Sequence, residues 1–99
     1  MYGLQGRMVA KPGQRPALLA LLLGASRGRK LPGCRIYIVS EVPAEPDAIA
    51  ITEVWDDRAA HAASLQLESV RALIAKARPL IAEMGEPLEL RPIGGQGLD

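Results

Sequence analysis

The sequence is poor in the residues that would support several common kinds of site. Among its 99 residues there are one cysteine and one histidine, so neither an internal disulfide nor a thiolate–imidazole zinc site can form. Phenylalanine is absent and aromatic residues make up only 3% of the chain, so its core must be built from aliphatic side chains. Excess charge is also lacking. Twelve Lys and Arg against 11 Asp and Glu exclude a strongly basic nucleic-acid-binding surface and an acidic disordered tail.

Long apolar runs are missing as well. The longest one, residues 17–23, is far shorter than the roughly 20 residues that a transmembrane helix needs. It also lies too far along the chain for a secretory signal peptide, and no basic segment precedes it at the N-terminus. We therefore expect a protein of the reduced cytoplasm, with no membrane partner, no nucleic-acid partner and no metal.

Alternation of apolar and polar residues predicts four strands. Period-two alternation indicates the first strand over 2–11. Segments 34–42 and 48–55 are rich in Ile and Val, and the short connector between them predicts a hairpin. A last strand is predicted over 88–93, where a proline indicates an edge or a bulge. We expect the glycine-rich tail 94–99 to cross onto a neighbouring subunit.

Two helices are predicted in the first two thirds of the chain. The first begins at Gln14, and its body, 17–23, is apolar on more than one side, which predicts a deeply packed helix. The basic residues 27–30 suit the C-terminal end of this helix, where cations oppose the negative end of the dipole. A short second helix is predicted from an N-cap at Asp56 to about Leu67.

A third helix is predicted to begin near Ser69 and to carry an apolar stripe at helical spacing. The stripe ends with Ile81 and Met84. Pro79 is expected to kink this helix or to end its regular part, because it removes one backbone donor and crowds the preceding turn. Gly85 is the predicted stop.

The order of these elements, β-α-β-β-α-α-β, predicts an α+β fold of the ferredoxin-like type with an antiparallel sheet, in a single domain over 2–97. The predicted strands are apolar on both faces: Val39 lies opposite Ile38, and Val54 opposite Ile51. Helices can cover only one face of such a sheet, so an uncovered second face would expose a large apolar patch. We therefore expect a homodimer.

Several short motifs resemble those of a known family. Thr52-Glu53-Val54-Trp55-Asp56 closes a strand and His61 follows it, while Lys11-Pro12-Gly13 precedes the leucine-rich helix and Pro32-Gly33-Cys34 opens a strand. Over nearly its whole length the chain resembles the antibiotic biosynthesis monooxygenase family, and within it the small stand-alone quinol monooxygenases. The resemblance implies a dimeric α+β barrel. It also implies oxidation of phenolic or quinol-like aromatic substrates by O2 without a metal or a flavin.

Such chemistry needs a base or a hydrogen-bond partner that favours the substrate anion, because an electron-rich phenolate can supply electrons to O2. Neutral imidazole is a suitable base near neutral pH, and His61 is the only histidine. The alternative for His61 is a side chain at the surface or at a subunit interface. Glu53 shares a strand face with Trp55 among aliphatic residues, which is unusual for a carboxylate. It is the second catalytic candidate, the alternative being a salt bridge across the interface.

Three further side chains are candidates for substrate binding. Trp55 either contacts the substrate or packs as an anchor of the core or of the dimer interface. Tyr37 alternates onto the side opposite Ile36 and Ile38, where its hydroxyl either lines a pocket or simply packs. Arg78 either stabilises a substrate anion or is solvated, and the same alternatives apply to Arg7, Arg35 and Arg71.

Haem-degrading relatives share the implied fold but rely on residues that are absent here. Gly6, Ser64 and Ile74 lie where such relatives carry an Asn, a Trp and a haem-ligating His, so haem oxygenation is disfavoured. The leading hypothesis is a cofactor-independent monooxygenase acting on a small quinol or polyphenol. The alternative is a non-catalytic dimeric module that binds a hydrophobic metabolite.

Overall fold

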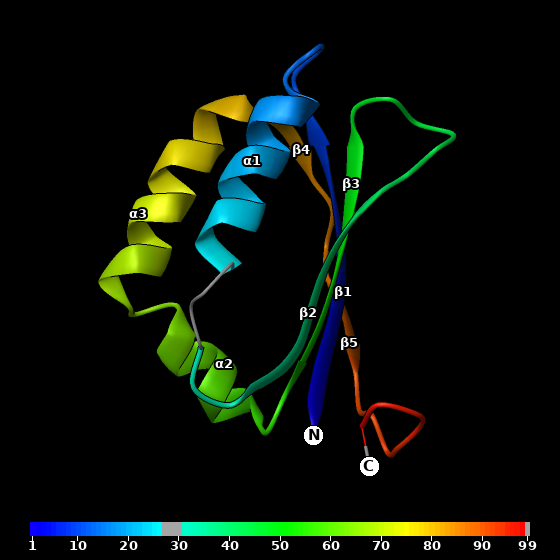
Figure 1. Cartoon of the computed structure of the whole chain (residues 1–99), viewed down its shortest axis with the longest axis vertical. Helices are drawn as coiled ribbons and strands as arrows, with labels where there is room; N and C mark the ends of the chain where they lie inside the picture. The colour runs from blue at the N-terminus through cyan, green and yellow to red at the C-terminus, as the bar shows by residue number, and fades with distance from the viewer. Residues whose placement is uncertain (27–30, 99) are drawn as a thin grey trace.

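A computed structural model shows one antiparallel sheet with all the helices on one of its faces (Figure 1). It describes residues 1–26 and 31–98, so the basic segment 27–30 lies outside the described residues. The elements are β1 (Tyr2–Ala10), α1 (Arg15–Ser26), β2 (Cys34–Glu41), β3 (Ala48–Trp55), α2 (Arg58–Ser64), α3 (Glu68–Ala77), the 3₁₀ turn η1 (Arg78–Leu80), β4 (Ile81–Met84) and β5 (Leu88–Leu90). The predicted α+β, ferredoxin-like fold class is confirmed. None of the helices described is long and apolar enough to cross a membrane.

The sheet is centred on β1 and β3, in the order β2-β3-β1-β4. Strand β5 also pairs with β1, so β4 and β5 follow one another along the same edge of that strand. Strand β4 pairs with the end of β1 around Met8, and β5 pairs with its beginning around Leu4. The sheet therefore has five strands where the sequence predicted four.

The extra strand arises because the third helix ends earlier than predicted. Helix α3 stops at Ala77, and Pro79 lies in a 3₁₀ turn that redirects the chain into β4. The prediction that Ile81 and Met84 belong to a helical stripe is wrong. They lie opposite Ala10 and Met8 across a bulge in the β1–β4 pairing. Because a bulge adds one residue to a strand, residues three apart come to share a face of the sheet, as they would in a helix.

The core lies between the sheet and helices α1 and α3, which run side by side (Figure 1). Leu18 and Leu22 of α1 are buried, and Leu18 is completely shielded from solvent. Full burial of such a side chain stabilises the fold by about 1.5–3 kcal/mol. Ala17 and Ala20 of the same helix are exposed, so the deep packing predicted for this helix holds for its leucines and not for these two alanines. The buried core residues are Met8, Ala10, Leu18, Leu22, Ile49, Ile51 and Ala77.

The start of β2 and helix α2 approach each other closely. Asp57, not Asp56 as predicted, is the N-cap of α2, and its carboxylate accepts a hydrogen bond from the backbone N–H of Ala60 at 2.7 Å. The Asp56 carboxylate instead accepts a hydrogen bond from Arg35 at 2.6 Å. Gly33 has a φ of +79°, and a Cβ at that position would lie 2.6 Å from the Cβ of Ala60. Only glycine allows both the turn and this contact.

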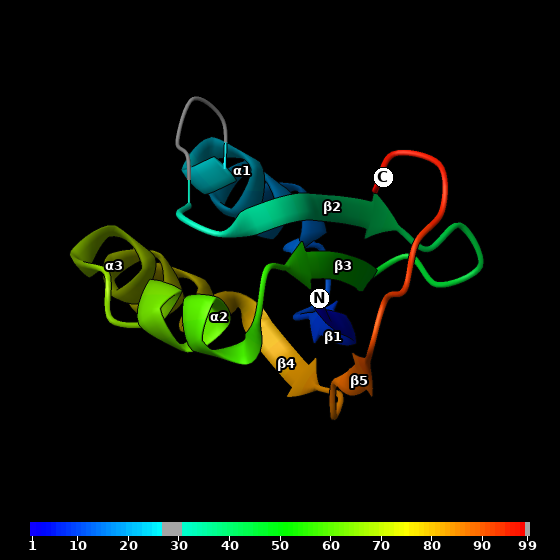
Figure 2. The same ribbon diagram turned by 90° about the horizontal axis from the view of Figure 1, so that it is seen from below.

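The opposite face of the sheet has no helix over it (Figure 2). The pairing register places Ile38 and Val54 on this face, as the alternation predicted. Ile38 is 50% exposed and Leu88 of β5 is 57% exposed. Pro92 packs against Gly3 on the same side, where a Cβ on Gly3 would lie 3.0 Å from the proline ring. The predicted crossing of the glycine-rich tail onto a second subunit stays a prediction.

Candidate active site

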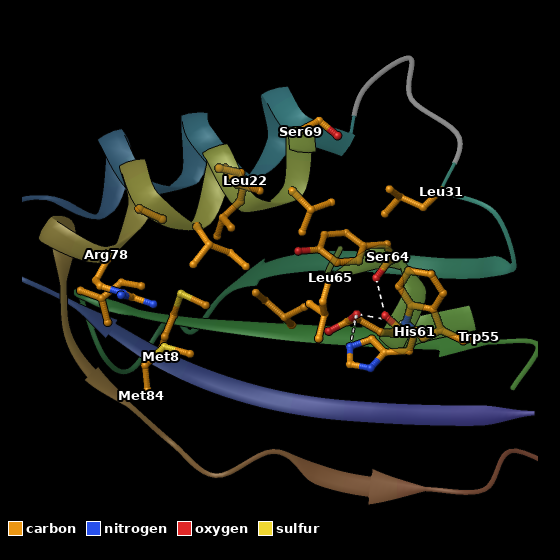
Figure 3. A pocket seen from close by; sticks show the side chains of 18 of the residues that line it. Met8, Leu22, Leu31, Trp55, His61, Ser64, Leu65, Ser69, Arg78 and Met84 are labelled. Carbon is orange, nitrogen blue, oxygen red and sulfur yellow. Dashed lines mark hydrogen bonds and ion pairs between the residues drawn. The ribbon is translucent and has the colours of Figure 1, made fainter. Parts of the chain in front are cut away.

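A pocket of about 490 Å³ lies between the sheet and helices α2 and α3 (Figure 3). Its size is within the range of small-molecule sites, and most of its wall is aliphatic. The aliphatic and thioether side chains of the wall belong to Met8, Leu22, Leu31, Ile51, Leu65, Val70, Leu73, Ile74, Ala77, Ile81, Ala82 and Met84. The structure brings all five predicted site residues to this one pocket: Tyr37, Glu53, Trp55, His61 and Arg78.

Glu53, Trp55 and His61 form a polar group on the wall of the pocket. The indole Nε1–H of Trp55 donates a hydrogen bond to Glu53 Oε1 at 3.1 Å. The same oxygen lies 4.0 Å from His61 Nε2, and the two side chains are only 19% and 20% exposed. Trp55 itself is buried, with its ring edge-on to the imidazole at 5.4 Å between centroids. Glu53 therefore has its partners within its own chain and points to the helix side of the sheet, away from the expected dimer face.

Three side chains that do not line the pocket lie next to the imidazole or to one another: Tyr2, Arg58 and Glu89. The sequence did not indicate them as site residues. The ring of Tyr2 lies 5.7 Å from that of His61, and the Arg58 guanidinium lies 5.0 Å from the Tyr2 ring centroid. Glu89 forms an ion pair with Arg58 and accepts a hydrogen bond from the Tyr2 hydroxyl at 3.5 Å. Tyr2 reaches this place because β1 pairs with β3 so that Tyr2 lies opposite Trp55. No local sequence signal reveals that register.

Tyr37 lies on β2 directly opposite Glu53. Burial, together with the nearby Glu53 carboxylate and, to a smaller extent, the Cys34 thiol, raises the pKa of Tyr37 to about 12. Its hydroxyl is therefore protonated at neutral pH, so it can donate a hydrogen bond but cannot act as a base. Among the described residues, no group of three or more His, Cys, Asp and Glu side chains is placed to hold a metal ion.

Arg78 lies at the other end of the pocket from His61 (Figure 3). It is the first residue of the 3₁₀ turn after α3. The three other candidate arginines do not line the pocket: Arg7 is paired with Glu45, Arg35 is paired with Asp56, and Arg71 is exposed on α3. The structure thus separates Arg78 from the three arginines that the sequence could not distinguish from it.

Comparison with known proteins gives consistent matches to one family. The sequence model of the antibiotic biosynthesis monooxygenase family matches residues 1–76. A crystal structure from Chloroflexus aurantiacus J-10-fl named for that family is 51% identical, with a TM-score of 0.91, and the match covers 99% of this chain and 98% of that chain. One from Deinococcus radiodurans, also named for the family, is 27% identical, with a TM-score of 0.81 and coverage of 96% and 95%.

More distant structures share the fold alone. PA3566 from Pseudomonas aeruginosa is 20% identical, with a TM-score of 0.82 and coverage of 94% of each chain. No curated protein matches the sequence significantly. The family match and the structural similarity therefore agree with each other, while neither names a substrate.

Proposed function

The chain belongs to the antibiotic biosynthesis monooxygenase family, and we propose that it oxidises a small quinol-like or polyphenolic substrate with O2 without a bound cofactor. One observation supports this most directly. A carboxylate and the only imidazole of the chain lie 4.0 Å apart on the wall of an otherwise aliphatic pocket. Such a pair can remove a proton from a phenol that is held among apolar side chains.

The reaction balances with the substrate as the only reductant. A hydroquinone gives up four electrons to one O2 molecule. One oxygen atom enters the ring, which becomes a hydroxyquinone, and the other leaves as one molecule of water. The first requirement is loss of the phenolic proton, because the phenolate is the form that transfers an electron to O2.

Each polar side chain of the pocket has a role in this proposal. His61 accepts the phenolic proton, and the Glu53 carboxylate stabilises the imidazolium that forms. The Trp55 indole N–H holds that carboxylate in place through its hydrogen bond. The neutral hydroxyl of Tyr37 is a hydrogen-bond donor for the phenolate oxygen. The aliphatic wall accommodates the ring and O2.

The test is oxygen uptake by metal-free, flavin-free protein with a panel of quinols. We expect uptake above the rate of autoxidation. His61→Ala should lower turnover by roughly 10²–10⁴, the usual contribution of a positioned general base. Gln66→Ala, an exposed residue just after α2 that does not line the pocket, is the matched control. Uptake no faster than autoxidation across the panel would favour the non-catalytic module that binds a hydrophobic metabolite.

The proposed enzyme is a homodimer that associates through the helix-free face of the sheet. The side chains exposed on this face include Ile38 and Leu88, with Leu90 beside them. Exposed apolar side chains gathered on one face are a common mark of a protein–protein interface. The pocket opens on the other side of the sheet, so a second copy on this face would leave it accessible.

A further inference from the structure

The pocket has two polar ends with an apolar stretch between them. Glu53 and His61 form one end, where protons are exchanged in the proposed function. Arg78 lies at the opposite end, next to Met8 and Met84 (Figure 3). A substrate ring held by Glu53 and His61 does not by itself require a cation so far away.

Two elements of the wall give the same length for the pocket. Along the sheet, the row that contains Met8 and Ile49 is four residues from Glu53, which corresponds to about 13 Å at the strand rise of about 3.3 Å per residue. Along α3, the wall extends from Ser69 to Arg78, which corresponds to about 13 Å at about 1.5 Å per residue. A single quinol ring fills only about half of this length.

Arg78 is also available to bind a ligand. It forms no ion pair with any other side chain among residues 1–26 and 31–98. Glu83 borders the same end, but it lies opposite Val9, and paired residues of an antiparallel sheet project to the same side. Val9 alternates with Met8 and Ala10 and faces away from the helices, and no ion pair joins Glu83 to Arg78 among the described residues.

We propose that the pocket takes an amphipathic acid: a quinol ring at the Glu53–His61 end, an apolar chain along the aliphatic wall, and a carboxylate that binds the guanidinium of Arg78. This inference rests on the proposed function for the position of the ring. Arginine suits the far end because its fixed fork of N–H donors matches the two oxygens of a carboxylate. In this assignment Arg78 determines specificity and takes no part in the oxidation itself.

The experiment measures binding without oxygen, so that it is independent of turnover. The probe is a hydroquinone with a pentanoate side chain, compared with the primary amide of the same compound. Trp55 is the only tryptophan and lines the pocket, so quenching of its fluorescence reports occupancy. For the wild-type protein we expect the acid to bind about 5- to 10-fold more tightly than the amide, a modest ratio because Arg78 is solvent-exposed.

Arg78→Gln should abolish this preference and leave the affinity for the amide within about twofold. Lys76→Gln is the matched control, because Lys76 is also a cation at the C-terminal end of α3 but does not line the pocket. It should preserve the preference for the acid. Equal binding of acid and amide by the wild-type protein, or no binding of either, would overturn the inference. An equal loss of the preference for the acid in Arg78→Gln and Lys76→Gln would also overturn it.

Oxygen uptake with the same two compounds separates this inference from the proposed function. Binding of the acid through Arg78 without oxygen uptake would leave the ligand class standing and refute the oxidation. If acid and amide bind equally tightly and both are oxidised, the proposed oxidation would stand and the role of Arg78 would be refuted. The comparison of the two compounds on the wild-type protein needs no variant, so the inference stays testable even if Arg78→Gln folds poorly.

Discussion

Replacing Glu53 by glutamine tests how the carboxylate acts on His61. Glutamine keeps the shape of the side chain and an oxygen that can still accept the hydrogen bond from Trp55, but it removes the negative charge. The proposed role of Glu53 is to stabilise the imidazolium that forms when His61 takes the substrate proton. The variant should therefore bind substrate much as the wild-type protein does and lose catalytic rate.

The expected size of the loss follows from the distance. Two unit charges about 4 Å apart attract each other by about 1 kcal/mol in water and by about 4 kcal/mol at the effective dielectric constant typical of pairs near a protein surface. The two side chains are about one fifth exposed, which places the pair between these limits. A loss of about 2–3 kcal/mol in transition-state stabilisation corresponds to a decrease in kcat/KM of about 30- to 150-fold.

The assay is steady-state oxygen uptake with the best quinol of the panel, for Glu53→Gln, His61→Ala and the double variant. Because Glu53 acts only through His61, the double variant should be no slower than His61→Ala alone. Glu83→Gln removes a carboxylate from the other end of the pocket and should stay within about threefold of the wild-type rate. The free energy of unfolding of Glu53→Gln should fall by less than about 1 kcal/mol.

Two results would refute this reasoning. The first is a Glu53→Gln variant with nearly full activity beside an inactive His61→Ala variant, which would show that the carboxylate does not stabilise the imidazolium. The second is a double variant much slower than either single one, which would show that the two side chains act independently.

Two further predictions concern stability and assembly. Because the folded-state pKa of Tyr37 is raised to about 12 while an unfolded tyrosine titrates near pH ~10, its contribution to stability is complete below pH ~10 and is lost above it. Between pH ~8 and pH ~11, urea unfolding of the wild-type protein should therefore lose about 1.4 kcal/mol more than that of Tyr37→Phe, and equal losses would contradict the burial of this hydroxyl. Light scattering at micromolar concentration should give twice the chain mass of 10.6 kDa for the wild-type protein and the single mass for Ile38→Lys, and a wild-type monomer would rule out the proposed dimer.

Local sequence patterns were sufficient to predict which face of the sheet each strand side chain occupies. Successive residues of a strand point to opposite sides, so the alternation in β3 places Ile49, Ile51, Glu53 and Trp55 on one face. The structure confirms that these four side chains share the helix side of the sheet, and that Tyr37 joins them from β2. The strand residues of the candidate site, Tyr37, Glu53 and Trp55, could be assigned to a face from the sequence because their direction depends mainly on backbone geometry.

Local patterns failed where the conformation depends on distant partners. Ile81 and Met84 have a spacing that fits a helix, and only their pairing with β1 across a bulge makes them part of a strand. Leucines lie on several sides of α1, so their positions in the sequence do not indicate which side the sheet would cover.

The sequence by itself therefore determined the fold class and the family resemblance, and it indicated Glu53 and His61 as the candidate acid–base pair. Only the tertiary structure decided that the Tyr2 ring lies beside His61 with Arg58 over it, and that Arg78, unlike three other arginines, lies at the far end of the pocket. The physical reason is that side-chain direction follows from backbone geometry within a few residues. Register, bulges and the position of one element against another are set by packing and hydrogen bonds between segments that are far apart in the chain.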